Sequence, residues 1–208
     1  TEHVRMFTEP AAPQGGDLIL NCQFTPDGAV NNAASYRHIP VEMTGNVPLQ
    51  YNTTIQSYEA QFNGNTSQFF KFFVGDQPSI MSQLSDAYSV EIYCQNSTEK
   101  PKASTRPMCF VNGYGFGLHM NSQGNICYTT TTQGNKTDGS YAKTQWSWIG
   151  VGSLTTDYTH YVIVYDRLHF VSRFYINGEE KAVRYLTFKE CPIYEWAPST
   201  WLAIGGDA

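Results

Sequence analysis

The fold is decided by the stretch Thr159-His160-Tyr161-Val162-Ile163-Val164-Tyr165-Asp166, which is followed, after a short linker, by Ser172-Arg173-Phe174-Tyr175-Ile176-Asn177-Gly178. Both parts are rich in β-branched and aromatic residues, as half-buried strands are. Asn177-Gly178 tolerates the positive φ angles of a tight hairpin turn, so a third strand is expected over residues 180–186. The stretch therefore predicts an antiparallel meander, and the apolar face of a meander needs a second sheet to cover it.

Short strands are expected along most of the remaining chain, because apolar and polar residues alternate between turn signals. The clearest examples are residues 17–24 and 87–94, and Asn112-Gly113 is expected to turn a hairpin. Residues 76–85 are the one candidate helix, with Asp76 as its cap. Roughly a dozen strands with at most one or two short helices predict an all-β fold, a two-sheet antiparallel jelly-roll sandwich.

The composition is typical of one secreted β domain. The chain has 208 residues, of which 41% are hydrophobic and 15% charged, and its net charge is -5. Residues 1–16 are expected to form an extended arm and residues 17–208 a single domain. No stripe of Lys and Arg offers a footprint for nucleic acid, and no apolar run reaches the roughly 18 residues that cross a bilayer. The chain starts at Thr1 without a visible signal peptide, so export to the periplasm, the cell surface or the medium is an inference from composition.

Cysteine spacing indicates no metal site. None of the cysteines stands in a C-x-x-C pair, and their spacings fit no common zinc arrangement. Cys94 and Cys109 bracket a polar loop and could form a disulfide, whereas buried free thiols are expected for the others. The five cysteines are Cys22, Cys94, Cys109, Cys127 and Cys191.

Five segments resemble, in order, the motifs of laminin-G-like domains. Phe62-Asn63-Gly64 resembles the turn after an early strand, and residues 88–93 resemble the strand written FSLEaW. Residues 159–166 resemble WhHvavvYD, residues 174–179 resemble lYvNGe, and residues 201–207 resemble f.IGgd. The chain is therefore similar, over about residues 17–207, to the laminin-G-like branch of the concanavalin A-like lectin/glucanase superfamily. It is similar in style to exported modules of gut Bacteroidetes, which are often fused to a phosphoesterase or a glycosidase.

The resemblance also raises the question of catalysis, because this superfamily includes glucanases. Those enzymes carry their carboxylates as E-x-D-x-x-E on one strand face, and the chain lacks that motif. Glu179 and Glu180 are adjacent, so a strand points them to opposite faces. The five histidines are scattered, and no catalytic residue is assigned. Relatives often hold Ca²⁺ with loop oxygens, for which the candidates are Asn135, Asp138, Asp157 and Asp207.

Aromatic residues are the strongest functional signal. Sugars stack their C–H faces on flat rings and bond to nearby amides and carboxylates. Trp146 and Trp148 share a face of the strand expected over residues 146–151, close to the loop that holds Tyr141. Tyr194 and Trp196 lie in a loop bounded by prolines. These five side chains are expected to line one rim of the concave sheet, with packing in the core or at an edge as the structural alternative.

Three functions follow as hypotheses. The first is a non-catalytic exported module that binds a glycan or glycoprotein. The second is an accessory structural domain that docks on a catalytic domain, such as a phosphoesterase, in the same polypeptide. The third is a glycoside hydrolase or lyase of the same fold, which would need a pair of catalytic carboxylates.

Overall fold

The computed structural model describes residues 18–33, 39–62, 68–73, 87–95, 111–113, 116–120, 125–132, 145–146, 149–153, 157–186 and 202–205. Within these residues the chain is all-β, with antiparallel strands and no helix, which confirms the expected fold class. The arm expected over residues 1–16 and the helix expected over residues 76–85 lie outside the described residues. The strands form three sheets, called sheets A, B and C below.

Sheet C contains the predicted meander. Its order is β15-β14-β13-β7, and every neighbouring pair is antiparallel. Along β13, side chains alternate between buried and half-buried, so that Tyr161, Ile163 and Tyr165 all point into the core. The strands are β7 (Ala87–Cys94), β13 (Thr159–Asp166), β14 (Val171–Ile176) and β15 (Glu179–Tyr185).

The turn between β14 and β15 has the predicted chemistry. Asn177 and Gly178 both have positive φ angles, of 51° and 81°. Asn177 is also bound to the start of β13, because its backbone N–H donates to the His160 carbonyl at 2.8 Å and its Oδ1 accepts from the His160 N–H at 2.9 Å. This side chain therefore extends the ladder between β13 and β14 past the end of β14.

Sheet B is the largest sheet, with the order β11-β10-β9-β8-β16-β6-β3 and β12 also paired to β10. β11 and β12 share one register on β10, since Trp146 lies opposite Thr131 and Ile149 lies opposite Tyr128. Of the strand expected over residues 146–151, the described parts, Trp146 and 149–151, therefore pair with β10 in the same register. The strands are β3 (Val41–Thr44), β6 (Phe69–Phe72), β8 (Val111–Gly113), β9 (Phe116–Met120), β10 (Asn125–Thr132), β11 (Gln145–Trp146), β12 (Ile149–Ser153) and β16 (Leu202–Ile204).

The hairpin predicted around Asn112-Gly113 is confirmed, since β8 pairs antiparallel with β9, but Asn112 and Gly113 are not its turn, because both residues belong to β8. Asn112 lies opposite Gly117 of β9 on one side and opposite Ala203 of β16 on the other. Asn-Gly favours a turn only where the backbone is free to reverse, and here the ladders on both sides hold it extended. Tertiary pairing has overridden the local preference.

Sheet A is small and was not predicted as a separate unit. Its order is β2-β1-β5-β4. The backbone just before β1 is held by hydrogen bonds from the buried side chain of Asn31. Asn31 Oδ1 accepts the N–H groups of Asn21 and Ala33, and Asn31 Nδ2 donates to the Ile19 carbonyl. The strands are β1 (Cys22–Thr25), β2 (Gly28–Asn31), β4 (Leu49–Asn52) and β5 (Ser57–Ala60).

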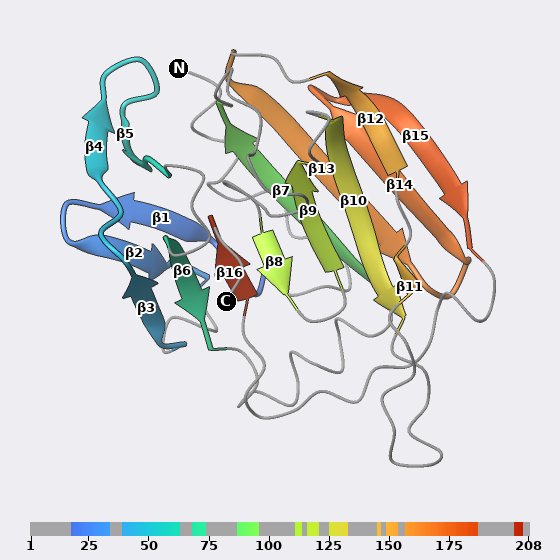
Figure 1. Cartoon of the computed structure of the whole chain (residues 1–208), viewed down its shortest axis with the longest axis horizontal. Coiled ribbons are helices and arrows are strands. Elements are labelled where there is room, and N and C mark those ends of the chain that lie inside the picture. Colours follow the sequence, from blue (N-terminus) through green and yellow to red (C-terminus); the bar gives the residue numbers. More distant parts are fainter. Residues whose placement is uncertain are drawn as a thin grey trace.

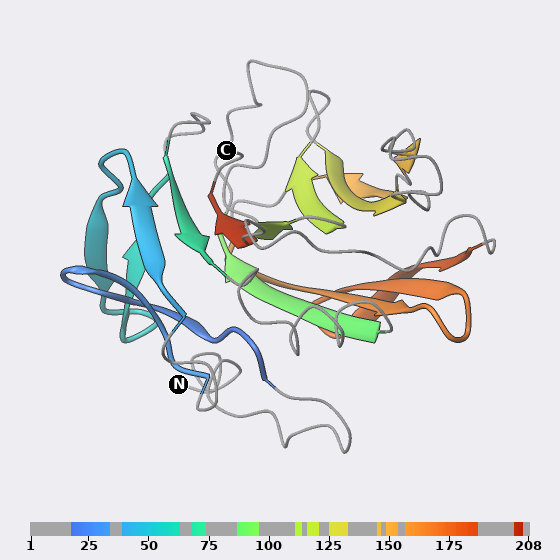
Figure 2. The same cartoon turned by 90° about the horizontal axis from the view of Figure 1, so that it is seen from below.

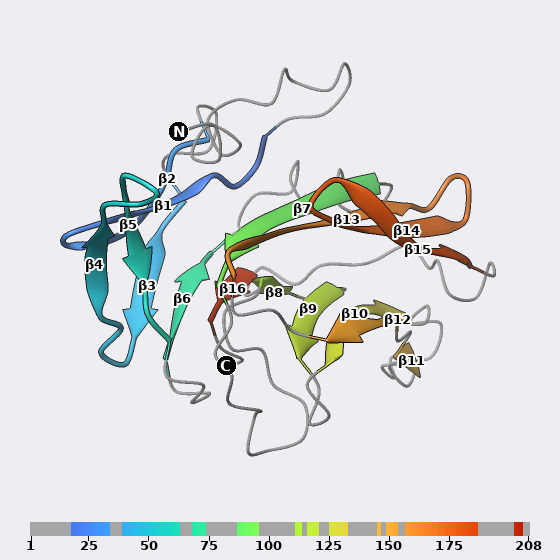
Figure 3. The same ribbon diagram turned by 90° about the horizontal axis from the view of Figure 1, so that it is seen from above.

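Sheets B and C face each other as two layers, and sheet A closes one end of the sandwich (Figure 1). In Figures 2 and 3, β8 to β12 lie on one side of the core and β7, β13 and β14 on the other. Phe70 and Phe72 of β6 are buried beside Leu202 of β16, and they share one core with Phe174 of β14. Full burial of side chains of this size contributes about 1.5–3 kcal/mol each, so this cluster is the main stabilising element.

Candidate functional site

The aromatic residues singled out from the sequence are not brought together by the described residues. Trp146 ends β11, where it lies opposite Thr131 of β10. Tyr141, Trp148, Tyr194 and Trp196 lie outside the described residues. Their grouping along a rim of the sandwich therefore stays a prediction.

A different polar surface lies where sheet A meets sheet C. Successive side chains of a strand point to opposite faces, so β4 and β5 have one apolar and one polar face. Leu49 and Ala60 lie opposite each other and pack against the core. On the other face, Gln50 lies opposite Glu59. Alternation along the strands adds Asn52 to this face.

Hydrogen bonds join this face to a residue far away in the sequence. Glu59 Oε2 accepts from Asn52 Nδ2 at 2.9 Å and from the hydroxyl of Tyr158. Asn52 Nδ2 also donates to the Tyr158 oxygen, at 2.7 Å. Gln61 Nε2 donates to Glu59 Oε1 at 3.3 Å and to Gln50 Oε1 at 3.0 Å. These five residues, Gln50, Asn52, Glu59, Gln61 and Tyr158, are called the Glu59 cluster.

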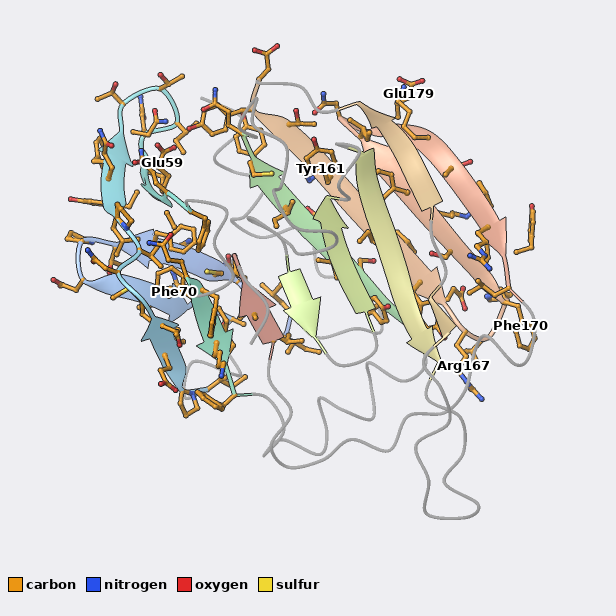
Figure 4. All side chains as sticks on the ribbon, viewed as in Figure 1. Glu59, Phe70, Tyr161, Arg167, Phe170 and Glu179 are labelled. Carbon is orange, nitrogen blue, oxygen red and sulfur yellow. The ribbon has the colours of Figure 1, made fainter. Side chains whose placement is uncertain are left out.

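The cluster continues onto the outer face of sheet C. Tyr158 precedes β13, and its ring stacks on that of Tyr93 of β7, with centroids 5.4 Å apart and planes 21° apart. Next to Tyr93 in the ladder is His160, whose Nε2 lies 3.4 Å from Glu91 Oε2. Glu59 itself lies on β5, at the end of the molecule formed by sheet A (Figure 4). Carboxamides, carboxylates and two stacked phenols thus share one surface.

The ionisation of the cluster follows from its hydrogen bonds. Burial acts to raise the pKa of Glu59, but hydrogen bonds from Tyr158, Asn52 and Gln61 outweigh it and hold this pKa below its usual value. Burial, together with the neighbouring Glu59 carboxylate, raises the pKa of Tyr158 to about 12. Burial also raises the pKa of Tyr93. At neutral pH the cluster therefore presents one carboxylate and the protonated phenol of Tyr158, with the protonated phenol of Tyr93 stacked beside it.

This arrangement suits binding better than bond breaking. A tyrosine nucleophile needs a lowered pKa, whereas that of Tyr158 is raised, and an ionised Glu59 has no proton to donate as a general acid. The cluster can hold polar groups in place without activating any of them.

The described residues also bear on metal ions and membranes. No three His, Cys, Asp or Glu residues among them come close enough to hold a metal ion. Of the calcium candidates, Asp157 is exposed, and its backbone oxygen accepts from Thr159 Oγ1 at 2.9 Å. Asn135, Asp138 and Asp207 lie outside the described residues. In the part of the chain that the structure describes, no helix meets the length and hydropathy of a membrane span.

Sequence reasoning missed the Glu59 cluster for a physical reason. Alternation at Gln50 and Asn52, and again at Glu59 and Gln61, marks two polar strand faces. Nothing local indicates that Tyr158, 99 residues from Glu59, reaches the same surface. The polar face of a strand ordinarily contacts water. Only the tertiary structure shows that the side chains on this face are hydrogen-bonded to one another and to Tyr158.

The described chain is thus an antiparallel β-sandwich with a polar surface at one end. Its structure is similar to that of domain 4 of AbnA, a GH43 extracellular arabinanase from Geobacillus stearothermophilus, solved in complex with arabinotriose. The TM-score is 0.51 at 15% sequence identity, and the match covers 86% of this chain and 78% of that domain. At this identity the likeness establishes the fold alone.

A weaker likeness joins the chain to the CBM40 of the Ruminococcus gnavus IT-sialidase, solved both alone and bound to α2,3-sialyllactose. The TM-score is 0.40 at 12% identity, over 66% of this chain and 73% of that one, which is too low to carry an argument. No protein-family model matches the chain, and no curated protein matches it by sequence. What the comparisons support is a β-sandwich, and the laminin-G-like branch stays a prediction.

Proposed function

We propose that this protein is a non-catalytic module that binds carbohydrate, either as a free glycan or on a glycoprotein. The Glu59 cluster is the main support for the proposal, because it gathers a carboxylate, three carboxamides and Tyr158, whose ring stacks on Tyr93, on a surface where Gln50 and Gln61 are exposed. Sugar hydroxyls bond to carboxylates and amides, and the C–H faces of sugars lie on aromatic rings. The similarity to domain 4 of an arabinanase, which was solved with arabinotriose, supports the same reading.

Further parts of the proposal rest on the sequence. The predicted aromatic residues, Tyr141, Trp146, Trp148, Tyr194 and Trp196, would supply a second stacking surface. An exported location would bring the module into contact with polymeric or cell-surface glycans. The extracellular source of the arabinanase supports that location.

Glycan binding can be tested directly with the whole chain on an array that includes arabino-oligosaccharides, followed by titration calorimetry on the best hits. Glu59→Ala should weaken binding by about tenfold or more, because it removes the acceptor around which the cluster is built. Glu42→Ala is the matched control, since Glu42 is an exposed carboxylate on β3 in sheet B. Trp146→Ala tests the predicted aromatic surface separately. A blank array would refute the proposed function.

A docking role is the second candidate, favoured by exposed apolar side chains at one end of sheet C. Leu168 is 65% exposed and Tyr185 is 79% exposed, and Phe170 and Val183 are exposed near them. Large exposed apolar groups that gather in one region often contact another protein. A catalytic domain of the same polypeptide would be the expected partner. A double change, Leu168→Ser with Tyr185→Ser, should then weaken that association without affecting glycan binding.

A further inference from the structure

We propose that Gln50 is the residue through which the Glu59 cluster binds a sugar, as a donor of hydrogen bonds, and that Glu59 is a positioning residue that fixes the direction of the Gln50 carboxamide. This inference rests on the proposed function and names the contact residue of the same surface. Its ground is the run of hydrogen bonds that leads outwards from Glu59 through Gln61 to Gln50.

The run of hydrogen bonds starts at an ionised carboxylate. Glu59 is charged at neutral pH, since burial raises its pKa less than its hydrogen-bond donors lower it. An ionised carboxylate only accepts hydrogen bonds. The Gln61 atom that lies 3.3 Å from Glu59 Oε1 must therefore be the nitrogen, Nε2, as the structure has it. The carboxylate thus decides between the two orientations of the Gln61 carboxamide.

The same nitrogen decides the orientation of Gln50. Gln61 Nε2 also lies 3.0 Å from the Gln50 carboxamide, and a carboxamide nitrogen only donates, so the atom that meets it must be Gln50 Oε1. Turning the Gln50 carboxamide over would set two N–H groups against each other. Gln50 Nε2 is therefore held on the branch that points away from Gln61, with two N–H groups to donate.

The position of Gln50 makes these N–H groups accessible to a ligand. Gln50 lies on β4, the last strand of sheet A, and is exposed, whereas Asn52 and Glu59 are half-buried. Asn52 Nδ2 donates to Glu59 and Tyr158, and the Tyr158 hydroxyl donates to Glu59. In the described part of the chain, the hydrogen bond of Gln50 uses its oxygen and leaves its nitrogen for an acceptor oxygen of a sugar.

A fixed direction favours binding for an entropic reason. An exposed glutamine that rotates freely loses side-chain entropy when it is held by a ligand, and one of its two carboxamide orientations offers an oxygen instead of a nitrogen. The bond from Gln61 holds the Gln50 oxygen inwards before any ligand arrives. Glu59 therefore acts on the ligand through Gln61 and Gln50.

The orientation can be tested without a ligand, by measuring how fast the side-chain amide protons of the isotope-labelled whole chain exchange with water. Gln50→Met and Gln61→Met identify the two pairs of signals, since each variant lacks one pair. The Gln61 protons should exchange several-fold more slowly than those of Gln50, because hydrogen bonds protect them. Glu59→Gln should reduce this difference. Equal exchange in the wild type, or slower exchange at Gln50, overturns the assigned orientation.

The contact is tested by binding to an array of cellotetraose, mannotetraose, chitotetraose and arabinotriose, with calorimetry on the strongest of these. Gln50→Met should weaken binding by roughly tenfold, the effect of losing a hydrogen bond to the sugar. Gln56→Met is the matched control and should bind as the wild type does, because Gln56 is an exposed glutamine in the turn between β4 and β5.

A double-mutant cycle tests the role of Glu59. Glu59→Gln should weaken binding several-fold, and the double variant with Gln50→Met should bind about as weakly as Gln50→Met alone, because Glu59 acts through Gln50. A role in stability alone, or a separate contact with the sugar, makes the two losses multiply. Losses that multiply therefore overturn the positioning role.

The outcomes separate this inference from the proposed function. Wild-type affinity in Gln50→Met overturns the role of Gln50 and leaves carbohydrate binding standing. No binding by the wild type to any member of the array or to the arabino-oligosaccharides overturns the function, and the role of Gln50 as its contact with it.

Discussion

Gly205 meets Phe62 just after β16, and this contact joins two of the five segments that resemble laminin-G-like motifs. Gly205 has a φ of 98°, and a Cβ on it would overlap the Phe62 ring. Both the backbone angle and the ring therefore require glycine. The contact brings together two segments that lie about 140 residues apart in the sequence.

Gly205→Ala should lower the free energy of unfolding by about 2–4 kcal/mol, since it adds both a clash and a strained φ. Gly178→Ala is the matched control: its φ is 81°, but no atom lies within 4 Å of the new Cβ. That change should cost only the strain, about 1 kcal/mol. Urea denaturation measures both values. Equal costs would show that the Phe62 contact does not matter.

Cys22 makes a second prediction, this one for alkaline pH. Burial raises the pKa of its thiol to about 12, so the folded protein keeps the proton where the unfolded chain loses it, above about pH 8.5. Its contribution is complete below pH 8.5 and is lost as the pH rises towards 12. The melting temperature of Cys22→Ala should therefore fall less steeply between pH 8 and pH 10 than that of the wild type. Parallel slopes would contradict the assignment.

Among the elements, the chain before β1 depends on a side chain. Asn31 is 4% exposed and bonds to the backbone at Ile19, Asn21 and Ala33. Asn31→Ala should cost about 2–4 kcal/mol, because it leaves these buried backbone groups without partners. Asn32→Ala is the control, since its described side-chain bond is to Gln23, and it should cost below about 1 kcal/mol. Thermal melts compare the two, and similar losses would argue against this role for Asn31.

The elements also show how far the sequence predicts the fold. β7 and the three strands of the meander were predicted because their pattern of alternation is long and their turn is local. The pairing of β8 with β9 was predicted, but Asn112 and Gly113 of β8 were mistaken for the turn, because both residues also pair with β16, a strand about 90 residues further along the chain. Sheet A was not predicted as a unit, since four-residue strands carry little pattern and their pairing is not local.

The candidate site was likewise predicted only in part from the sequence. Trp146 and the other predicted aromatic residues were chosen by residue type, which identifies a sugar-binding chemistry but no location. Glu59 and Asn52 were passed over because each is an ordinary polar strand residue. Only Tyr158, which is brought next to them by the packing of sheet A against sheet C, makes them a cluster.

At the scale of the whole molecule, Tyr158 links sheet A to sheet C, because it bonds to Glu59 and Asn52 and stacks on Tyr93. Tyr158→Phe keeps the ring on Tyr93 but removes the bonds to Glu59 and Asn52, so it should cost about 1 kcal/mol and speed amide exchange in β4 and β5. The Glu59 pKa lies below its usual value, so its contribution is present at neutral pH and is lost as the pH falls through the acid range. The variant should therefore lose less stability than the wild type between pH 6 and pH 4.

Tyr51→Phe is the control for that experiment, because Tyr51 is half exposed and its described contact is an edge-to-face one with Tyr58. It should change neither the amide exchange of β4 and β5 nor the acid limb of the stability curve. Identical acid limbs for Tyr158→Phe and the wild type would mean that Glu59 does not depend on the phenol.

β16 is the last strand of the described chain, and it lies inside sheet B between β6 and β8 rather than at an edge. Residues 202–204 are synthesised well after β6 and β8, so neither of these strands can gain its shared central partner until Leu202–Ile204 has left the ribosome. Until then the two facing strand edges stay unpaired, and unpaired edges of this kind are where a nascent chain associates wrongly.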